Sequence, residues 1–206
     1  MSDINYRILR FDELVVQPNR GEDVARAIKA NGPPPSAQLL GVFQPLIGVS
    51  SNIVTVVTNW TGEPAPHCYE NAATRSVRSR VFDTLARGQM PCTADGIYTH
   101  RWFVVAPDQV QALTALSAEA WRSSEADTGM RIAGFWNCRQ PTADGAALVL
   151  MIVNYPSLTA WDESRYWKPK PEHQAQPNRD VWGGLFARRR EILLDSWVTV
   201  HQLAKS

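Results

Sequence analysis

A tyrosine, a histidine and a tryptophan at alternate positions form the part of this sequence best suited to chemistry. In an extended strand over residues 98–105, the side chains of Tyr98, His100 and Trp102 point to one face of a sheet. An imidazole titrates near neutral pH, so His100 is a candidate general acid or base. Tyr98 and Arg101 are candidates for stabilising the negative charge that proton abstraction next to a carbonyl creates. The alternative for His100 is a hydrogen-bonded packing residue.

Two asparagines occupy matching places, each at the end of a predicted strand and next to an aromatic residue. Asn59 precedes Trp60, and Asn154 precedes Tyr155. A carboxamide N–H could hold a carbonyl or enolate oxygen of a substrate. The alternative is structural, because asparagine often ends a strand by bonding to nearby backbone groups. Both roles stay open, and we place Asn59, Asn154 and Trp60 among the candidate substrate contacts.

Tryptophan is unusually frequent, with eight among 206 residues. Trp102 and Trp136 are predicted to form the aromatic wall of a ligand cleft, with ordinary core packing as the alternative for each. Trp167 and His173 lie beside or within a proline-rich segment, residues 168–177. This segment predicts either a lid over the cleft or a solvated connector, and Trp167 and His173 are further candidate contacts.

The remaining chemistry-bearing side chains form no local motif. The histidines at positions 67, 100, 173 and 201 lie far apart, and no CxxC or HxxxH pattern occurs, so we expect no metal and no cofactor. Haem is kept as an alternative, because one axial histidine needs no spacing. The arginines at residues 188–190 fall at the end of a predicted helix, which favours a solvated face over phosphate binding.

Charge and composition exclude several classes of partner. Lys and Arg number 21 against 20 Asp and Glu, so the net charge of +1 offers no field for nucleic acid. No apolar stretch approaches the roughly 20 residues of a membrane span, and no leader for secretion is recognised. Cys68, Cys92 and Cys138 leave one cysteine over in any pairing, which favours free thiols. We therefore expect a cytoplasmic protein without nucleic-acid or membrane partners.

The elements that must position these residues recur along the chain. Three pairs of segments match in the same order: residues 6–11 with 98–103, 41–44 with 134–137, and 55–60 with 150–155. These matches predict two homologous units, residues 1–92 and 93–206. Each unit reads as strand, helix, two-stranded hairpin, helix and strand, which is the ferredoxin-like order.

Hydrophobic periodicity and turn signals give the expected elements. In the first unit we predict strands at residues 8–16, 38–48 and 53–60, helices at 21–30 and 67–86, and a last strand that is either short, near residues 90–93, or lost. In the second we predict strands at 98–105, 131–139, 147–155 and 192–201, and helices at 107–121, 158–167 and 178–190. Because a ferredoxin-like sheet has helices on one face only, we predict an α+β fold in which two antiparallel sheets form one pseudo-dimeric barrel of about eight strands.

Three stretches of the second unit, residues 129–135, 149–158 and 161–165, resemble the NIPSNAP family of the dimeric α+β barrel superfamily. Residues 94–103 are similar to the opening of the second unit in the two-repeat bacterial members. The resemblance implies tandem ferredoxin-like units in one barrel, with a ligand cleft between the sheet and the helices of each unit. It transfers no catalytic residue. Relatives in the superfamily include cofactor-free monooxygenases, lactone isomerases, polyketide cyclases and haem-binding enzymes.

These observations lead to one functional prediction and its alternatives. We predict that the chain binds a small apolar or aromatic molecule and performs cofactor-independent proton transfer of lyase, isomerase or monooxygenase type, with His100 moving the proton. The alternatives are a non-catalytic binding or assembly protein, with a homodimer possible, and a haem-binding protein. A cavity of roughly 300 Å³ or more with convergent polar groups favours the first class, and a filled interior favours the assembly protein.

Overall fold

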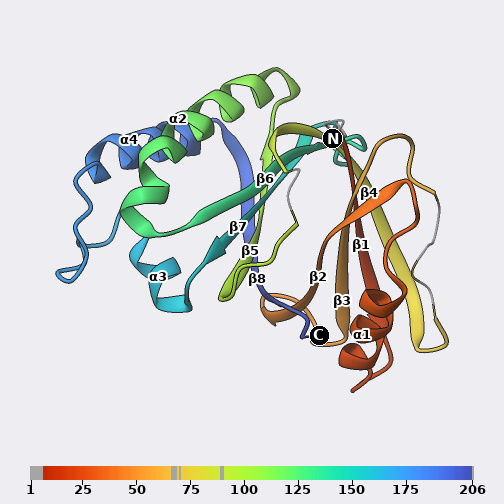
Figure 1. Cartoon of the computed structure of the whole chain (residues 1–206). Coiled ribbons are helices and arrows are strands. Elements are labelled where there is room, and N and C mark those ends of the chain that lie inside the picture. The colour runs from red at the N-terminus through yellow and green to blue at the C-terminus, as the bar shows by residue number, and fades with distance from the viewer. Residues whose placement is uncertain (1–6, 66–68, 70, 89–90, 206) are drawn as a thin grey trace, which may run out of the picture.

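An eight-stranded antiparallel barrel with helices on its outside forms the structure (Figure 1). The computed structural model describes residues 7–65, 69, 71–88 and 91–205. The strands close in the order β1-β3-β2-β8-β5-β7-β6-β4. The elements are β1 (Ile8–Val16), α1 (Gly21–Asn31), β2 (Ala37–Ile47), β3 (Ile53–Trp60), β4 (Thr74–Arg87), β5 (Ile97–Val105), the 3-10 turn η1 (Pro107–Gln109), α2 (Val110–Thr128), β6 (Arg131–Cys138), β7 (Ala147–Tyr155), α3 (Leu158–Glu163), α4 (Arg179–Glu191) and β8 (Leu193–Leu203).

The barrel consists of two halves with the same strand order. The first is β4-β1-β3-β2 and the second is β8-β5-β7-β6, joined along β2 with β8 and along β4 with β6. This arrangement confirms the predicted α+β fold with tandem ferredoxin-like sheets. The domain boundary predicted at residue 92 falls between β4 and β5. Closure leaves no exposed sheet edge, and the inner faces of the two sheets cover each other.

Strand pairing corrects one of the matches expected from the sequence. Leu9 pairs with Asn59 in the first half, as Tyr98 pairs with Asn154 in the second. By this pairing Phe11 is equivalent to His100 of the second half, whereas the sequence match aligned Phe11 with Phe103. The shift is an odd number of residues, so it decides whether the Phe11 ring lies inside or outside the barrel. The ring lies inside, in the same cluster as Trp102.

The helix predicted at residues 67–86 is wrong for the part that the structure describes. Thr74–Arg87 is strand β4, which pairs with β1 on one side and β6 on the other. The apolar spacing fits a helix, but closing the barrel requires a strand at this place, and tertiary pairing overrides the local pattern. Residues 66–68 and 70 lie outside the described residues, as do 89 and 90. Residues 91–93 are not in a strand, and β4 is the last strand of the first half.

Two helix ends of the second half also differ from the prediction. Helix α2 continues to Thr128 and ends at Gly129, whose φ of 70° lies in the left-handed region that glycine adopts without strain. Helix α3 ends at Glu163 instead of residue 167. The backbone carbonyls of Glu163, Arg165 and Lys168 accept hydrogen bonds from the Arg179 side chain, and this contact organises the chain that follows α3.

Alternation along the strands produces separate inner and outer cores. Inside the barrel, Phe11, Phe43, Trp102 and Trp136 pack together. A Cβ atom at Gly134 would lie only 2.3 Å from the Trp136 ring, so the inner core requires a glycine at this position. Outside, α2 and α4 lie side by side across the β5–β8 half, and α1 covers part of the β1–β4 half (Figure 1). The outer core of the second half therefore lies between sheet and helices.

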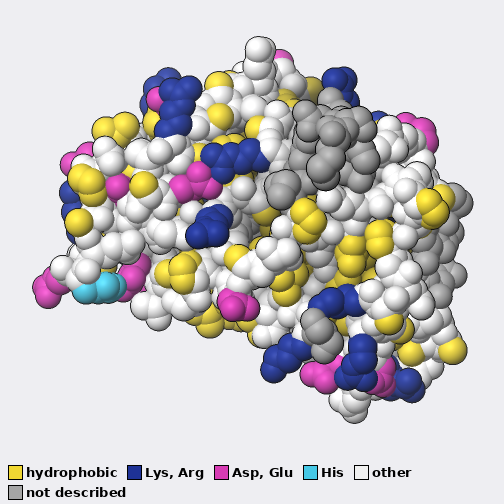
Figure 2. Space-filling model, viewed as in Figure 1, with side chains coloured by type: hydrophobic (Ala, Val, Ile, Leu, Met, Phe, Trp, Pro, Cys, Tyr) yellow, Lys and Arg dark blue, Asp and Glu magenta, His cyan; other side chains and the backbone are white. Residues whose placement is uncertain are grey.

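The surface carries both signs of charge. On the face shown in Figure 2, Lys and Arg side chains lie among Asp and Glu side chains, without one large field of a single sign. This distribution agrees with the balanced composition of the chain. Among the described residues no helix is long and apolar enough to span a membrane.

Candidate functional site

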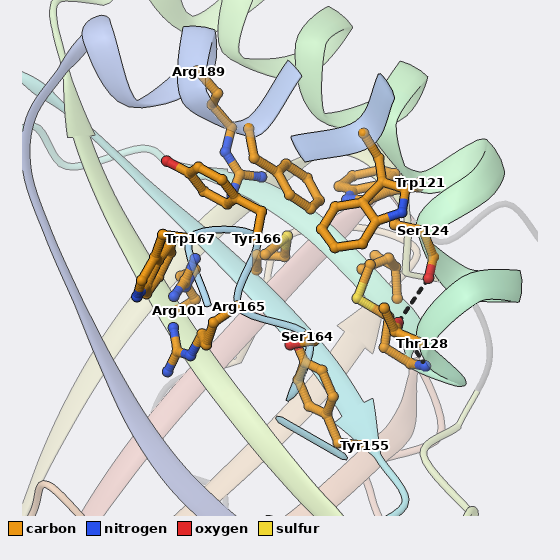
Figure 3. Close-up of a pocket in the computed structure, with 15 residues that line it drawn as sticks. Arg101, Trp121, Ser124, Thr128, Tyr155, Ser164, Arg165, Tyr166, Trp167 and Arg189 are labelled. Atoms are coloured by element: carbon orange, nitrogen blue, oxygen red, sulfur yellow. Dashed lines mark hydrogen bonds between the residues drawn. The ribbon is translucent and has the colours of Figure 1, made fainter. Parts of the chain in front are cut away.

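A pocket lies between the sheet of the second half and its helices, and we call it the sheet-helix pocket (Figure 3). It is built from the outer face of β5 and β7, from α2 and α4, and from the segment after α3. Its lining is aromatic or apolar on most sides and carries hydroxyl and guanidinium groups on the others. The lining residues are Arg101, Trp121, Ser124, Thr128, Met130, Ile132, Met151, Tyr155, Ser164, Arg165, Tyr166, Trp167, Trp182, Phe186 and Arg189.

Three guanidinium groups from different elements reach this pocket. Arg101 projects outward from β5, Arg165 follows α3, and Arg189 comes from the last turn of α4. In Figure 3, Arg101, Arg165 and Trp167 lie together on one side, and Arg189 reaches down from its helix. The Arg189 side chain is only 5% exposed and donates to Ser117 Oγ at 3.3 Å.

Aromatic rings surround these cations. The guanidinium carbon of Arg165 lies 4.1 Å from the Trp161 ring centre, and that of Arg189 lies 4.4 Å from the Phe186 ring centre. Such contacts stabilise a partly desolvated cation without neutralising its charge. The pocket therefore combines apolar walls with uncompensated positive charge.

The electrostatics of the three arginines are unfavourable in the absence of an anion. Burial lowers the pKa of Arg101, Arg165 and Arg189, and the positive charge of Arg101 lowers the pKa of the other two further. Within the described part of the chain, none of the three forms an ion pair with a carboxylate. Asp162 acts on Arg165 from a distance, but its carboxylate binds Lys168 Nζ at 2.6 Å. A bound anion would relieve this repulsion and raise the pKa values of the three guanidinium groups.

Two further buried donors line the pocket without a partner among the described residues. They are the Ser124 hydroxyl and the indole N–H of Trp121, both on α2. A buried donor left unpaired costs free energy, so such groups in a pocket wall point to a ligand that accepts hydrogen bonds.

The segment after α3 covers the pocket and is held down by one buried side chain. Arg179, which is 4% exposed, donates to the carbonyl oxygens of Arg165 and Lys168 at 2.7 Å each. It also donates to the side chain of Gln176. The proline-rich segment is therefore tethered at both ends to the first turn of α4, while Trp167 stays 55% exposed.

A second contact fixes the helices relative to each other. The Asp127 carboxylate at the end of α2 accepts a hydrogen bond from the indole N–H of Trp182 at 3.0 Å and from the backbone N–H of Asn178 at 2.8 Å. Asp127 is 3% exposed. This pairing places the Trp182 ring in the pocket wall and sets the start of α4.

The enclosed space is small. Its volume is about 40 Å³, and an adjoining space of about 150 Å³ shares Tyr166 and Trp167 in its lining. Both fall short of the roughly 300 Å³ that a drug-sized ligand pocket starts from. An aromatic ring system therefore enters this space only if side chains of the lining move.

Of the residues predicted from the sequence, the structure places Arg101 and Trp167 in this pocket. Tyr98, His100, Trp102 and Trp136 lie on the inner face of the sheet, inside the barrel, and are at most 4% exposed. The sheet itself separates them from Arg101. Their predicted roles stay predictions, but they belong to a different compartment from the sheet-helix pocket.

The predicted asparagines and the loop histidine lie outside this pocket, and Asn154 lines a separate cavity of about 570 Å³ together with Tyr98. The Asn59 amide donates to the Gly88 carbonyl at 2.7 Å, and the Asn154 amide donates to the carbonyls of Asp95 and Ile97 at 3.0 and 3.2 Å. These amides therefore hold the chain that links the two halves. Trp60 is buried, and its indole N–H donates to Thr58 Oγ1 at 2.8 Å. His173 is exposed, and its Nε2 lies 3.3 Å from Glu163 Oε2.

The sequence analysis missed Arg189. The run at residues 188–190 was expected to be a solvated face, and for Arg189 this is wrong, because its side chain is buried. The spacing of Trp182, Phe186 and Arg189 at i, i+4 and i+7 is the signal that could have placed it on the inner face of α4.

Comparisons with known proteins establish the fold. No protein-family model and no curated protein matches the chain. Several solved structures match along nearly the whole chain, including three of different description. These three are a candidate monooxygenase from Lactobacillus acidophilus NCFM (12% identity, TM-score 0.66, 98% of this chain and 95% of that one), an anthrone oxidase-like protein (16%, 0.60, 98% and 92%), and a ferredoxin-fold protein from Listeria monocytogenes related to antibiotic biosynthesis monooxygenases (8%, 0.54, 98% and 98%).

The Listeria neighbour is described as a ferredoxin-fold protein, in agreement with the strand order described above. Identities this low show a shared fold and nothing about activity. The resemblance to the NIPSNAP family stays a prediction, as does the internal sequence repeat.

Proposed function

We propose that this protein binds a small aromatic compound with an acidic hydroxyl, a phenol or an enol, and holds it as an anion in the sheet-helix pocket. One observation carries the proposal: Arg101, Arg165 and Arg189 converge on an aromatic pocket and have no carboxylate partner in the described part of the chain. An aromatic anion satisfies both features, because its ring replaces apolar contacts and its oxygen neutralises the guanidinium groups.

The same geometry suggests how the ligand is activated. Among the described residues, the lining contains no histidine, aspartate or glutamate that could serve as a general base. In this proposal the arginines lower the pKa of the bound hydroxyl, the proton leaves to solvent, and His100 does not take part. The resulting phenolate or enolate is electron-rich at carbon and can react with dioxygen. For an anthrone, the balanced reaction with dioxygen gives the anthraquinone and water.

The structural neighbours support this reaction class only by analogy. Their descriptions as a candidate monooxygenase and an anthrone oxidase-like protein apply to those proteins, at 12% and 16% identity. They justify testing an anthrone as the first oxidisable substrate.

Haem fits the sheet-helix pocket poorly. The described lining contains neither histidine nor cysteine as a usual axial ligand, and the enclosed volume is about 40 Å³. His173, the histidine of the neighbouring loop, points to Glu163 and is 68% exposed. Haem therefore has no part in the proposed chemistry.

Ionisation of a bound phenol tests the proposal directly. We expect the absorbance of 2-naphtholate to appear at a pH at least one unit lower in the presence of the protein, since nearby cations favour the anion by about this much. Anthrone is then supplied under air without added cofactor, and dioxygen uptake and anthraquinone are measured. The control ligand is 2-methoxynaphthalene, which cannot ionise and should bind more weakly.

The small enclosed volume favours one second function, a binding protein without catalysis. In that case 2-naphthol ionises on the protein but anthrone is not oxidised faster than in buffer. If neither 2-naphthol nor anthrone binds at millimolar concentration, the proposed ligand class is wrong. The predicted homodimer is a separate proposal that sedimentation would decide.

A further inference from the structure

A second cavity lies inside the barrel and is separated from the sheet-helix pocket by the sheet. Its volume is about 210 Å³. We call it the barrel-end cavity, because it lies toward the end of the barrel where β5 ends and β8 begins. Its lining residues are Phe11, Glu13, Val49, Thr55, Arg78, Arg80, His100, Trp102, Trp197, Thr199 and His201.

Two stacked imidazoles form part of the wall of this cavity. The rings of His100, on β5, and His201, on β8, lie 3.9 Å apart and 20° from parallel. His201 Nε2 is 2.7 Å from Thr199 Oγ1. His100 is completely buried, and neither of its ring nitrogens has a hydrogen-bond partner among the described residues. Two buried imidazoles in aromatic surroundings must both be neutral, and burial accordingly lowers the pKa of His201 to about 4.

The polar atoms without partners are not confined to His100. His201 Nδ1 and Thr55 Oγ1, from β8 and β3, are also buried and unpaired in the described structure. Unpaired buried polar atoms destabilise the folded state, so three residues carrying them around one cavity require an explanation. A molecule in the cavity that both donates and accepts hydrogen bonds supplies one.

The rest of the lining selects the chemistry of that molecule. Phe11 packs edge-on against His100 and Trp102, and the Trp102 and Trp197 rings are stacked 5.8 Å apart. Glu13 is paired with Arg80 at 3.2 Å, and Arg78 adds a further positive charge. The walls therefore suit an apolar or aromatic body, and the balance of charge suits an anionic head.

We propose that the barrel-end cavity binds a small carboxylic acid with an apolar or aromatic body, its carboxyl group bonded to His100 and Thr55. The neutral imidazole N–H of His100 and the Thr55 hydroxyl donate to the carboxyl oxygens. A proton taken up from solvent is held by the paired imidazoles or shared with the ligand. The proposal does not depend on the sheet-helix pocket, which opens on the opposite face of β5.

Binding of a carboxylate at this place takes up one proton. Near neutral pH the free ligand is ionised and the free imidazoles are neutral, whereas the complex holds one proton between them. The groups that face His100 are Glu13 on β1, Arg78 and Arg80 on β4, and His201 on β8, together with Tyr98 on its own strand. Glu13 and Arg80 already neutralise each other, so the proton resides on the histidines or the ligand. We expect affinity to rise about tenfold per pH unit as pH falls from 7 to 5.

Nuclear magnetic resonance of the full chain labelled in its histidine rings tests this inference, with benzoate as the probe. We expect benzoate to shift the resonances of His100 and His201 and to leave exposed His173 unchanged. Single His→Gln variants assign the signals, and His173→Gln is the matched control that should bind benzoate like the parent chain. Signals from the sheet-helix pocket do not interfere, because neither histidine lies in its wall.

Two variants of different severity keep the test independent of folding. Thr55→Val keeps the shape and removes one donor, and we expect benzoate affinity to fall about tenfold. His100→Phe removes both nitrogens in an aromatic setting and should abolish binding while the melting temperature is retained. If the histidine signals do not shift with benzoate, or shift only with Zn²⁺, the proposal is overturned. Benzoate affinity that is independent of pH, or unchanged in the Thr55→Val and His100→Phe variants, also overturns it.

Discussion

The outer faces of the two barrel halves contain buried charge in different forms. In the first half, Asp12 of β1 pairs with Val56, and in the second, Arg101 of β5 pairs with Met151, so the two occupy the same place in their sheets. Asp12 accepts hydrogen bonds from Arg10 Nε at 2.9 Å and from the Ser79 hydroxyl. Arg101 has no ion pair in the described part of the chain.

This difference separates a structural charge from one available to a ligand. Arg10 and Asp12 are 4% and 1% exposed, and Arg10 also donates to the Ala65 carbonyl, so the pair is closed and anchors the backbone at Ala65. A closed pair has no capacity left for another molecule. Arg101, Arg165 and Arg189 of the second half have no carboxylate partner in the described part of the chain, so they can still bind an anion. This is the physical basis for assigning the ligand to the sheet-helix pocket.

Breaking the closed pair should have the largest effect. We expect Asp12→Asn to lower the free energy of unfolding by about 3–5 kcal/mol, because it leaves the Arg10 charge buried without its partner. Urea denaturation measures the loss. The control is Asp23→Asn, which removes a 2.9 Å ion pair with Arg20. Both side chains of this pair are about half exposed, so the substitution should change the free energy of unfolding by less than about 1 kcal/mol. Equal losses in the two variants would remove the distinction between the faces.

Weakening the hydrogen bonds of Arg179 in the second half should have the second-largest effect on stability. Arg179→Lys keeps the charge but cannot reach the carbonyls of Arg165, Lys168 and Glu163 together, so we expect a loss of about 2–3 kcal/mol in urea denaturation. Chymotrypsin should cleave after Trp167 faster in this variant. Arg188→Lys, at an exposed position on the same helix, is the matched control. If the Arg179 contacts do not stabilise the fold, the free energy of unfolding and the cleavage rate of Arg179→Lys will equal those of the parent chain.

Removing the open charge should affect ligands rather than folding. We expect Arg101→Gln to weaken 2-naphtholate binding by roughly 10- to 100-fold, about 1.4–2.8 kcal/mol, the range of a charge-assisted hydrogen bond. Calorimetry above the ionisation midpoint of the ligand measures this. Arg122→Gln removes an arginine on α2 that is 77% exposed, and should leave the affinity unchanged. Similar weakening by both substitutions would indicate a general charge effect and not a site.

The smallest effect is expected for the stability of the same variant. Without ligand, Arg101→Gln should change the free energy of unfolding by less than about 1 kcal/mol, because relief of repulsion from Arg189 offsets the lost contacts. Urea denaturation alongside Asp12→Asn makes the comparison direct. A loss as large as that of Asp12→Asn would show that Arg101 has a structural partner and is not reserved for a ligand.

Several features were determined by local sequence. The alternation over residues 98–105 fixed which β5 side chains share a face, and both faces are as predicted, with Tyr98 and Trp102 inside and Phe103 outside. Apolar runs that follow turn signals also gave the strands at residues 53–60 and 147–155, which match β3 and β7. Such patterns depend on neighbours along the chain, and the chain alone encodes them.

Other features depend on contacts between distant segments, and only the tertiary structure decided them. Residues 74–87 form a strand because β1 and β6 both need a partner there, although their apolar spacing also fits a helix. His100 faces the barrel and Arg101 faces the helices, but only barrel closure shows which of these two faces meets the sheet-helix pocket. Arg189 turns inward and donates to Ser117 on α2, and Arg101 and Arg165 reach the same pocket from distant segments. Whether a charge is paired depends on what the fold brings within a few ångströms of it, and spacing in sequence does not contain that information.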